Sequence, residues 1–184
     1  MEGTVPRFER RAWAEAFPDL PDPSAEPASL EIYLLRPGRP DFNLKLRNGA
    51  LEMKELVLEQ DGLQQWRPTA KLGFPLPACE LRELDIDPVE TTNAYADFEC
   101  LRSCLERAGL VILALTKRRR LFEREGCRAE TTLVESGRHR SLTAAVEDVD
   151  PDRVGRAATE MGLGRFPNIA YPGAMLAWCS SDTG

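Results

Sequence analysis

Histidine is nearly absent from this sequence. Of 184 residues one is histidine, His139, and it lies in the turn-like segment Ser-Gly-Arg-His-Arg over 136–140. Ser-His-Asp hydrolysis and His-ligated metal sites both need this residue type, so the sequence offers almost no basis for either chemistry. We expect His139 to be a solvated turn residue.

Cysteine is sparse, dispersed and odd in number. The five cysteines are Cys79, Cys100, Cys104, Cys127 and Cys179. Such a set does not resemble a secreted disulfide framework, which favours a reducing cytoplasm. Cys100 and Cys104 are spaced to share a helix face, but no second close pair and no nearby histidine completes a zinc site. We therefore expect the cysteines to be small core residues.

Long apolar runs are also missing, and the chain carries an excess of acid. No run approaches the roughly 20 residues of a membrane span, and no signal peptide opens the chain. With 42% hydrophobic and 29% charged residues, the composition is that of one globular domain over residues 1–184. The net charge of -6 argues against a general nucleic-acid-binding surface.

Alternating apolar residues and turn dipeptides predict two clusters of strands around a central helix. Asn48-Gly49 and Asp61-Gly62 indicate hairpins, and a proline-rich loop covers 18–27. The expected strands are Val5–Trp13, Leu30–Leu35, Phe42–Arg47, Ala50–Leu58, Gln64–Thr69, Leu110–Phe122, Cys127–Glu135 and Ser141–Asp148. The expected helices are Asn93–Ala108 and one between Asp150 and Gly162, followed by a short last element over Pro167–Trp178. This pattern predicts an α+β fold, and closure into an antiparallel barrel is plausible.

Strand alternation places many charged side chains on one face of each strand. In Phe42–Arg47, Lys45 and Arg47 share a face, and in Ala50–Leu58, Glu52 and Lys54 do. One interpretation is a half-exposed sheet with a solvated polar face. The other is a barrel whose charged faces line an internal channel, where carboxylates or a multivalent anion balance the cations.

A basic run, Lys-Arg-Arg-Arg over 117–120, suggests a nucleic-acid patch as a further alternative. The overall acidity and the division of this run between two strand faces make that alternative weak. Lys117 and Arg119 instead join the proposed channel face.

The ordered set of charged strands resembles the CYTH superfamily, the triphosphate tunnel metalloenzymes. The resemblance spans Arg7 to about Trp178 and includes the closing segment Pro167–Pro172. It rests on Arg7-Phe8-Glu9-Arg10-Arg11, two Lys-x-Arg strands, an x-Glu-x-Lys strand, and Glu130 and Glu147 in the two strands that follow. It implies an eight-stranded antiparallel tunnel with helices packed outside that binds inorganic or organic triphosphates with a divalent metal.

Residue by residue, the resemblance implies two sets of ligands. The expected phosphate-binding residues are Arg11, Lys45, Arg47, Lys54, Lys117, Arg119 and Arg128. The expected ligands of Mg²⁺ or Mn²⁺ are Glu9, Glu52, Glu130 and Glu147.

The sequence departs from the family pattern mainly on the metal side. Arg7 replaces the first glutamate of the Glu-x-Glu-x-Lys start, and Thr132 and Ala145 stand where acids are usual. Losing carboxylates weakens a site for a hard cation.

Three functions remain open. The first is a metal-dependent triphosphatase, the second a non-catalytic binder of a phosphorylated ligand with an eroded metal site, and the third a structural or partner-binding barrel. The first two imply a small phosphorylated ligand and no nucleic-acid or membrane partner.

Overall fold

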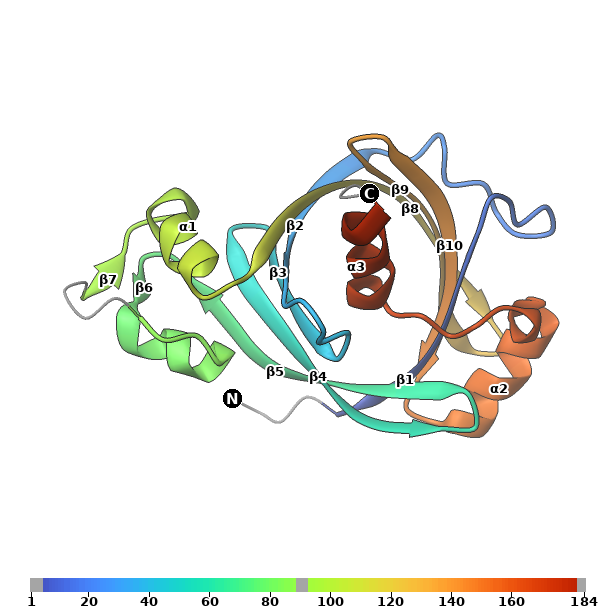
Figure 1. Ribbon diagram of the computed structural model, residues 1–184. Coiled ribbons are helices and arrows are strands. Elements are labelled where there is room, and N and C mark those ends of the chain that lie inside the picture. The colour runs from blue at the N-terminus through green and yellow to red at the C-terminus, as the bar shows by residue number, and fades with distance from the viewer. Residues whose placement is uncertain (1–4, 89–92, 182–184) are drawn as a thin grey trace.

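Eight antiparallel strands close into a barrel, which confirms the expected fold (Figure 1). The computed structural model describes residues 5–88 and 93–181. The barrel strands are β1 (Arg7–Ala14), β2 (Ala28–Leu35), β3 (Phe42–Arg47), β4 (Ala50–Gln60), β5 (Leu63–Gly73), β8 (Val111–Arg124), β9 (Cys127–Ser136) and β10 (His139–Asp148). Their order around the barrel is β1-β10-β9-β8-β2-β3-β4-β5, and β5 pairs with β1 to close it.

Tight turns fix the hairpin registers. Asn48 and Gly49 both have positive φ, 51° and 74°, as a two-residue hairpin turn requires. The turn pairs Lys45 with Glu52 across β3 and β4. Side chains of alternate residues therefore point either into the barrel or towards its outside, as the charge alternation predicts.

Two helices pack on the outside of the barrel. Helix α1 (Phe98–Arg107) covers the outer faces of β2 to β5, where its Leu101 and Leu105 join Leu34 and Leu44 in one buried cluster. Helix α2 (Pro151–Glu160) covers β1, β9 and β10 in a second cluster. Shorter elements complete the exterior: η1 (Ala78–Leu84), β6 (Leu76–Pro77), β7 (Ala94–Tyr95) and η2 (Leu163–Arg165).

The last helix, α3 (Tyr171–Ser181), lies on the interior side of the barrel wall (Figure 1). Its Tyr171 and Met175 are buried against Tyr33, Leu35 and Leu115, which share the strand faces that carry the interior charges. This end of the interior is therefore filled by apolar and aromatic side chains, because the strands become apolar there.

Residues 18–27, which we call the strap, cross the outside of the barrel. Strands β10, β9 and β8 lie between β1 and β2, so the connection must pass over them. Thr131 Oγ1 donates to the carbonyl of Pro21 at 2.5 Å, and Arg118 donates to the carbonyl of Glu26 at 2.9 Å. Arg120 forms an ion pair with the Glu26 carboxylate at 2.8 Å. The outward half of the basic run thus anchors the strap.

The helix expected over Asn93–Ala108 begins later than predicted, at Phe98. Ala94–Tyr95 pairs instead with Leu76–Pro77, and the Asp97 carboxylate accepts a hydrogen bond from the backbone N of Cys100 at 2.8 Å. An aspartate N-cap of this kind fixes where the helix starts.

Two predictions about single residues were wrong. Cys79 and Cys100 are exposed, whereas Cys104 and Cys127 are buried as expected. His139 lies in strand β10, and its ring stacks on Trp178 of α3 with centroids 5.1 Å apart. The sequence could not reveal this stacking because α3 reaches β10 only through the tertiary fold.

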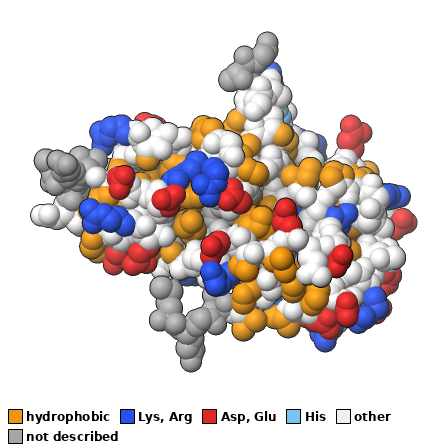
Figure 2. All heavy atoms as spheres, turned by 60° about the horizontal axis from the view of Figure 1, so that its bottom comes forward, with side chains coloured by type: hydrophobic (Ala, Val, Ile, Leu, Met, Phe, Trp, Pro, Cys, Tyr) orange, Lys and Arg blue, Asp and Glu red, His pale blue; other side chains and the backbone are white. Residues whose placement is uncertain are grey.

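Basic and acidic side chains are interspersed on the outer surface. On the face shown in Figure 2, Lys and Arg side chains of the described residues lie close to Asp and Glu side chains among apolar groups. Exposed pairs such as Arg67–Glu55, at 2.6 Å, are examples of this mixing. Among the helices of the described residues, none has the length and apolar character needed to span a membrane.

Candidate functional site: a charged cavity inside the barrel

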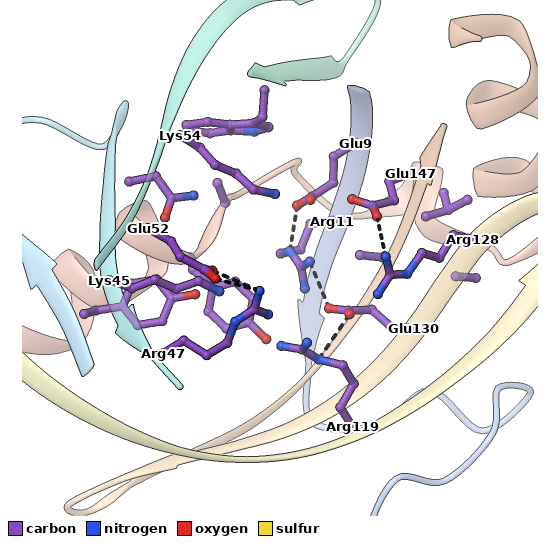
Figure 3. Close-up of a pocket in the computed structure, with 18 residues that line it drawn as sticks. Glu9, Arg11, Lys45, Arg47, Glu52, Lys54, Arg119, Arg128, Glu130 and Glu147 are labelled. Atoms are coloured by element: carbon purple, nitrogen blue, oxygen red, sulfur yellow. Dashed lines mark hydrogen bonds and ion pairs between the residues drawn. The ribbon is translucent and has the colours of Figure 1, made fainter. Parts of the chain in front are cut away.

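A cavity of about 180 Å³ occupies the interior of the barrel. Its wall contains residues of all eight barrel strands together with Tyr171 of α3. The charged residues that line it are Glu9, Arg11, Lys45, Arg47, Glu52, Lys54, Arg119, Arg128, Glu130 and Glu147 (Figure 3). Six cations against four carboxylates give this wall a net charge of +2 in a chain of net charge -6. The structure therefore brings together every predicted site residue except Lys117.

The carboxylate of Glu31 is surrounded by cations. Nζ of Lys45 and Nζ of Lys117 lie 3.0 and 2.9 Å from its Oε2. The guanidinium groups of Arg119 and Arg47 lie 3.4 and 4.0 Å from its Oε1. The Glu31 side chain is 2% exposed, and Lys117, Lys45 and Arg119 hold its pKa far below the usual range despite burial.

A second buried network joins β1, β8 and β9. The guanidinium of Arg11 donates to Glu9 Oε1 at 2.8 Å and to Glu130 Oε1 at 3.0 Å. Arg119 approaches Glu130 from the other side, with Nε 3.2 Å from Oε2. Burial would raise the pKa of Glu130, but Arg11 and Arg119 outweigh it and lower this pKa to about 2.

Besides its ion pairs, Arg11 forms a hydrogen bond and a contact with an aromatic ring. It is almost fully buried, its NH1 donates to Thr143 Oγ1 at 3.3 Å, and its guanidinium lies 4.5 Å from the ring centroid of Tyr171. Five donors in a planar group suit arginine to such a position. Arg11 therefore links α3 to the carboxylates of the tunnel wall.

The other two predicted acids form ion pairs with more exposed partners. Glu52 contacts Arg47 at 2.9 Å and Lys71 at 3.3 Å. Glu147 contacts Arg128 at 3.5 Å. Lys71 and Arg128 are 70% and 59% exposed, so water weakens these two pairs more than the buried ones.

Lys54 differs from the other cations of the wall. In the part of the chain that the structure describes, its ammonium forms no ion pair, and Figure 3 shows it extending into the cavity. It is thus a cation that a ligand reaches without displacing a protein carboxylate.

Lys117 lies beneath the cavity and does not line it. Its side chain is fully buried, and Nζ contacts Glu31, the hydroxyl of Tyr33 at 3.0 Å and the Tyr171 ring at 3.5 Å from the centroid. Burial lowers the pKa of Lys117 well below its usual value. Its predicted role in holding phosphate stays a prediction.

Arg7, which replaces the first family glutamate, lies at the edge of the tunnel. It lines a neighbouring hollow of about 210 Å³ together with Lys54 and Trp66. Its substitution for an acid therefore adds positive charge beside the cavity.

Several buried polar atoms of the interior lack a hydrogen-bond partner among the described residues. Arg47 Nε, Arg119 Nε and the hydroxyl of Tyr171 belong to side chains that line the cavity. Arg119 Nε is close to Glu130, but outside hydrogen-bond geometry. Buried donors without hydrogen-bond partners are costly, and these three belong to side chains that line the cavity.

The predicted metal ligands do not form a metal centre in this arrangement. Within residues 5–88 and 93–181, no three acidic, histidine or cysteine side chains are grouped closely enough to hold an ion. Each of the four glutamates instead forms an ion pair with at least one Lys or Arg. In this arrangement the four carboxylates are paired with cations, and their role in binding metal stays a prediction.

Sequence reasoning missed Glu31 and Tyr171 as site residues. Glu31 interrupts the apolar strand Leu30–Leu35 and has the same parity as Tyr33, which is a detectable signal. Tyr171 gave no comparable signal, since its place depends on how α3 enters the barrel.

Comparison with known proteins supports the fold. No protein-family model and no curated protein matches the chain. Among solved structures, a candidate adenylate cyclase from Bacillus halodurans is 11% identical with a TM-score of 0.55, covering 93% of this chain and 97% of that one. A protein from Pyrococcus horikoshii is 14% identical with a TM-score of 0.46, covering 95% and 99% of the two chains. A candidate adenylyl cyclase from Hippeastrum, described as having dominant triphosphatase activity, is 14% identical with a TM-score of 0.41, covering 85% and 88%.

The first of these similarities shows a shared fold over nearly the whole of both chains. Together with the closed order of eight antiparallel strands, it confirms the expected fold, a closed antiparallel barrel that this chain shares with the Bacillus halodurans protein.

Proposed function

We propose that the tunnel binds an anion made of linked phosphate groups, such as a triphosphate or inorganic tripolyphosphate. The observation that carries this proposal is the surplus of cations around the cavity. A low-dielectric interior with excess positive charge is stabilised by a multivalent anion.

The wall supplies suitable contacts for several phosphate oxygens. Arg47, Arg119 and Arg128 offer planar guanidinium groups, which bind phosphate by paired hydrogen bonds. Lys54 adds a point charge without a competing carboxylate, and the Tyr171 hydroxyl adds a neutral donor.

The position of the charge limits the ligand to a small one. The cationic surplus is enclosed within the barrel, whereas the outer face shown in Figure 2 mixes both signs. We therefore expect a short phosphate chain to bind and a nucleic acid not to bind.

Metal-dependent hydrolysis is a second candidate function, and one observation favours it. Glu52 and Glu147 line the cavity and are paired with exposed cations, so these two carboxylates are the most readily released from their present partners. Mg²⁺ or Mn²⁺ bound with a triphosphate would supply charge neutralisation at the phosphoryl group.

Calorimetric titration tests the binding proposal. Tripolyphosphate, ATP and thiamine triphosphate are titrated into the protein in the presence of EDTA, with sulfate as the control anion. We expect at least one triphosphate to bind at least about tenfold more tightly than sulfate, because it engages more cations. Equal affinity for sulfate and all three compounds would contradict a phosphate-chain site.

Phosphate release measured with Mg²⁺ or Mn²⁺ then separates enzyme from binder. Release that the Glu52→Gln and Glu147→Gln variants abolish supports hydrolysis at this site. Binding without release supports a non-catalytic protein. Neither binding nor release would favour the structural or partner-binding barrel.

A further inference from the structure

The carboxylate of Glu31 is the shared ion-pair partner of four cations in the tunnel. Four cations lie within 4.0 Å of its carboxylate, and two of them, Lys45 and Lys117, share its Oε2. Arg47 and Arg119 have second carboxylate partners in Glu52 and Glu130. The single negative charge of Glu31 is therefore too small to neutralise all four of these cations.

Glu31 lies behind the cavity wall. It does not line the cavity, yet Lys45, Arg47 and Arg119 do. The three side chains therefore stand between this carboxylate and any ligand, and Glu31 attracts the same cationic groups that a phosphate chain would need.

We propose that Glu31 is an internal counter-anion that weakens phosphate binding and so sets the affinity of the tunnel. This inference rests on the proposed function. It predicts an unusual result, since removing a buried acid would strengthen ligand binding. If Glu31 served only to hold the cations in place, its removal would loosen them and weaken binding.

Glu31→Gln is the appropriate variant because glutamine has nearly the same shape and keeps an oxygen that accepts hydrogen bonds. It removes the negative charge and replaces one acceptor oxygen with an NH2 group. At an effective dielectric near 20, one unit charge changes the affinity for another by about tenfold at a separation of about 12 Å, and by more at shorter range. We expect the variant to bind tripolyphosphate at least about tenfold more tightly, with a steeper loss of affinity as salt is added.

The control is Glu55→Gln, which makes the same change in net charge on the outer face of β4. Glu55 is half exposed and pairs with Arg67 at 2.6 Å, away from the cavity. Its affinity for tripolyphosphate should stay within about twofold of the unaltered protein, because solvent screens exposed charges.

Lys117→Met provides a second test that does not depend on the first variant folding. Lys117 is buried and does not line the cavity, and its ammonium contacts Glu31. Its removal frees Glu31 to neutralise Lys45 and Arg119 more fully, and tripolyphosphate binding should weaken at least about tenfold. The double variant, which lacks both charges, should return to within about threefold of the unaltered protein.

Calorimetry with tripolyphosphate in EDTA at low ionic strength measures the unaltered protein and the four variants. Binding by the unaltered protein together with weaker or unchanged binding by Glu31→Gln would overturn the role of Glu31 and leave the proposed function intact. Unchanged affinity in Lys117→Met would overturn it as well. No binding by the unaltered protein would instead overturn the proposed function.

Discussion

The ammonium groups of Lys45 and Lys117 meet at one oxygen atom, Oε2 of Glu31, at 3.0 and 2.9 Å. The two lysines come from β3 and β8, which flank β2 on either side. Two like charges this close repel each other, and the shared carboxylate makes the arrangement stable. The same arrangement leaves positive charge available on the cavity side, where Lys45 is exposed to a ligand.

Replacing a cavity cation should weaken binding of the phosphate chain. Lys45→Ala and Arg119→Ala are each expected to reduce tripolyphosphate affinity at least about tenfold, since a charge-assisted contact is lost. Arg118→Ala is the matched control, because Arg118 is next to Arg119 in the chain but its side chain points outwards to the strap. Calorimetry checks all three, and an equal effect in Arg118→Ala would show that the strand faces are wrongly assigned.

Removing the Tyr171 hydroxyl should affect binding more than folding. The hydroxyl has no partner among the described residues, so Tyr171→Phe is expected to change the free energy of unfolding by less than about 0.5 kcal/mol. Tripolyphosphate affinity should fall about fivefold because a donor to the anion is lost. Denaturant unfolding and calorimetry measure the two effects, and a large loss of stability with unchanged affinity would argue against this donor role.

Arg11 should matter for stability. Arg11→Met removes a buried partner of Glu9 and Glu130 and is expected to cost about 3 kcal/mol of unfolding free energy. Arg128→Met removes an exposed cation and should cost less than about 1 kcal/mol. Urea titration compares the two variants, and similar small losses would mean that the Arg11 network contributes little.

Ionised Glu130 should contribute to the free energy of unfolding, and this contribution should be lost in acid. Its pKa is lowered from the ordinary 4.5 to about 2, so the unfolded state takes up this proton at higher pH than the folded state does. The resulting stability is present above about pH 4.5 and is lost as pH falls towards about 2, with about 2 kcal/mol gone by pH 3.

Glu130→Gln removes this contribution and should flatten the dependence of unfolding free energy on pH between 6 and 3. Glu55→Gln is the control and should retain the full slope. Urea titrations at several pH values provide the measurement, and identical slopes in all three proteins would contradict the assignment to Glu130.

Local sequence patterns determined much of the barrel. The Asn48-Gly49 turn, the alternation in β3 and β4 and the Asp150 cap of α2 are each specified by a few neighbouring residues, so the hairpins and α2 were predictable. Parity alone likewise separated Lys117 and Arg119 from Arg118, because a strand has a fixed two-residue repeat.

Only the tertiary structure decided how these charges are shared. The neutral, apolar helix α3 enters the barrel interior and places Tyr171 against Arg11 and Lys117, a contact between residues far apart in the chain. Closure of the sheet then set β2 between β3 and β8, which made Glu31 the common partner of two lysines. Sequence determines the face on which a charge lies because that periodicity is local; which charges meet across the tunnel depends on strand order and on what fills the barrel, and both are long-range properties.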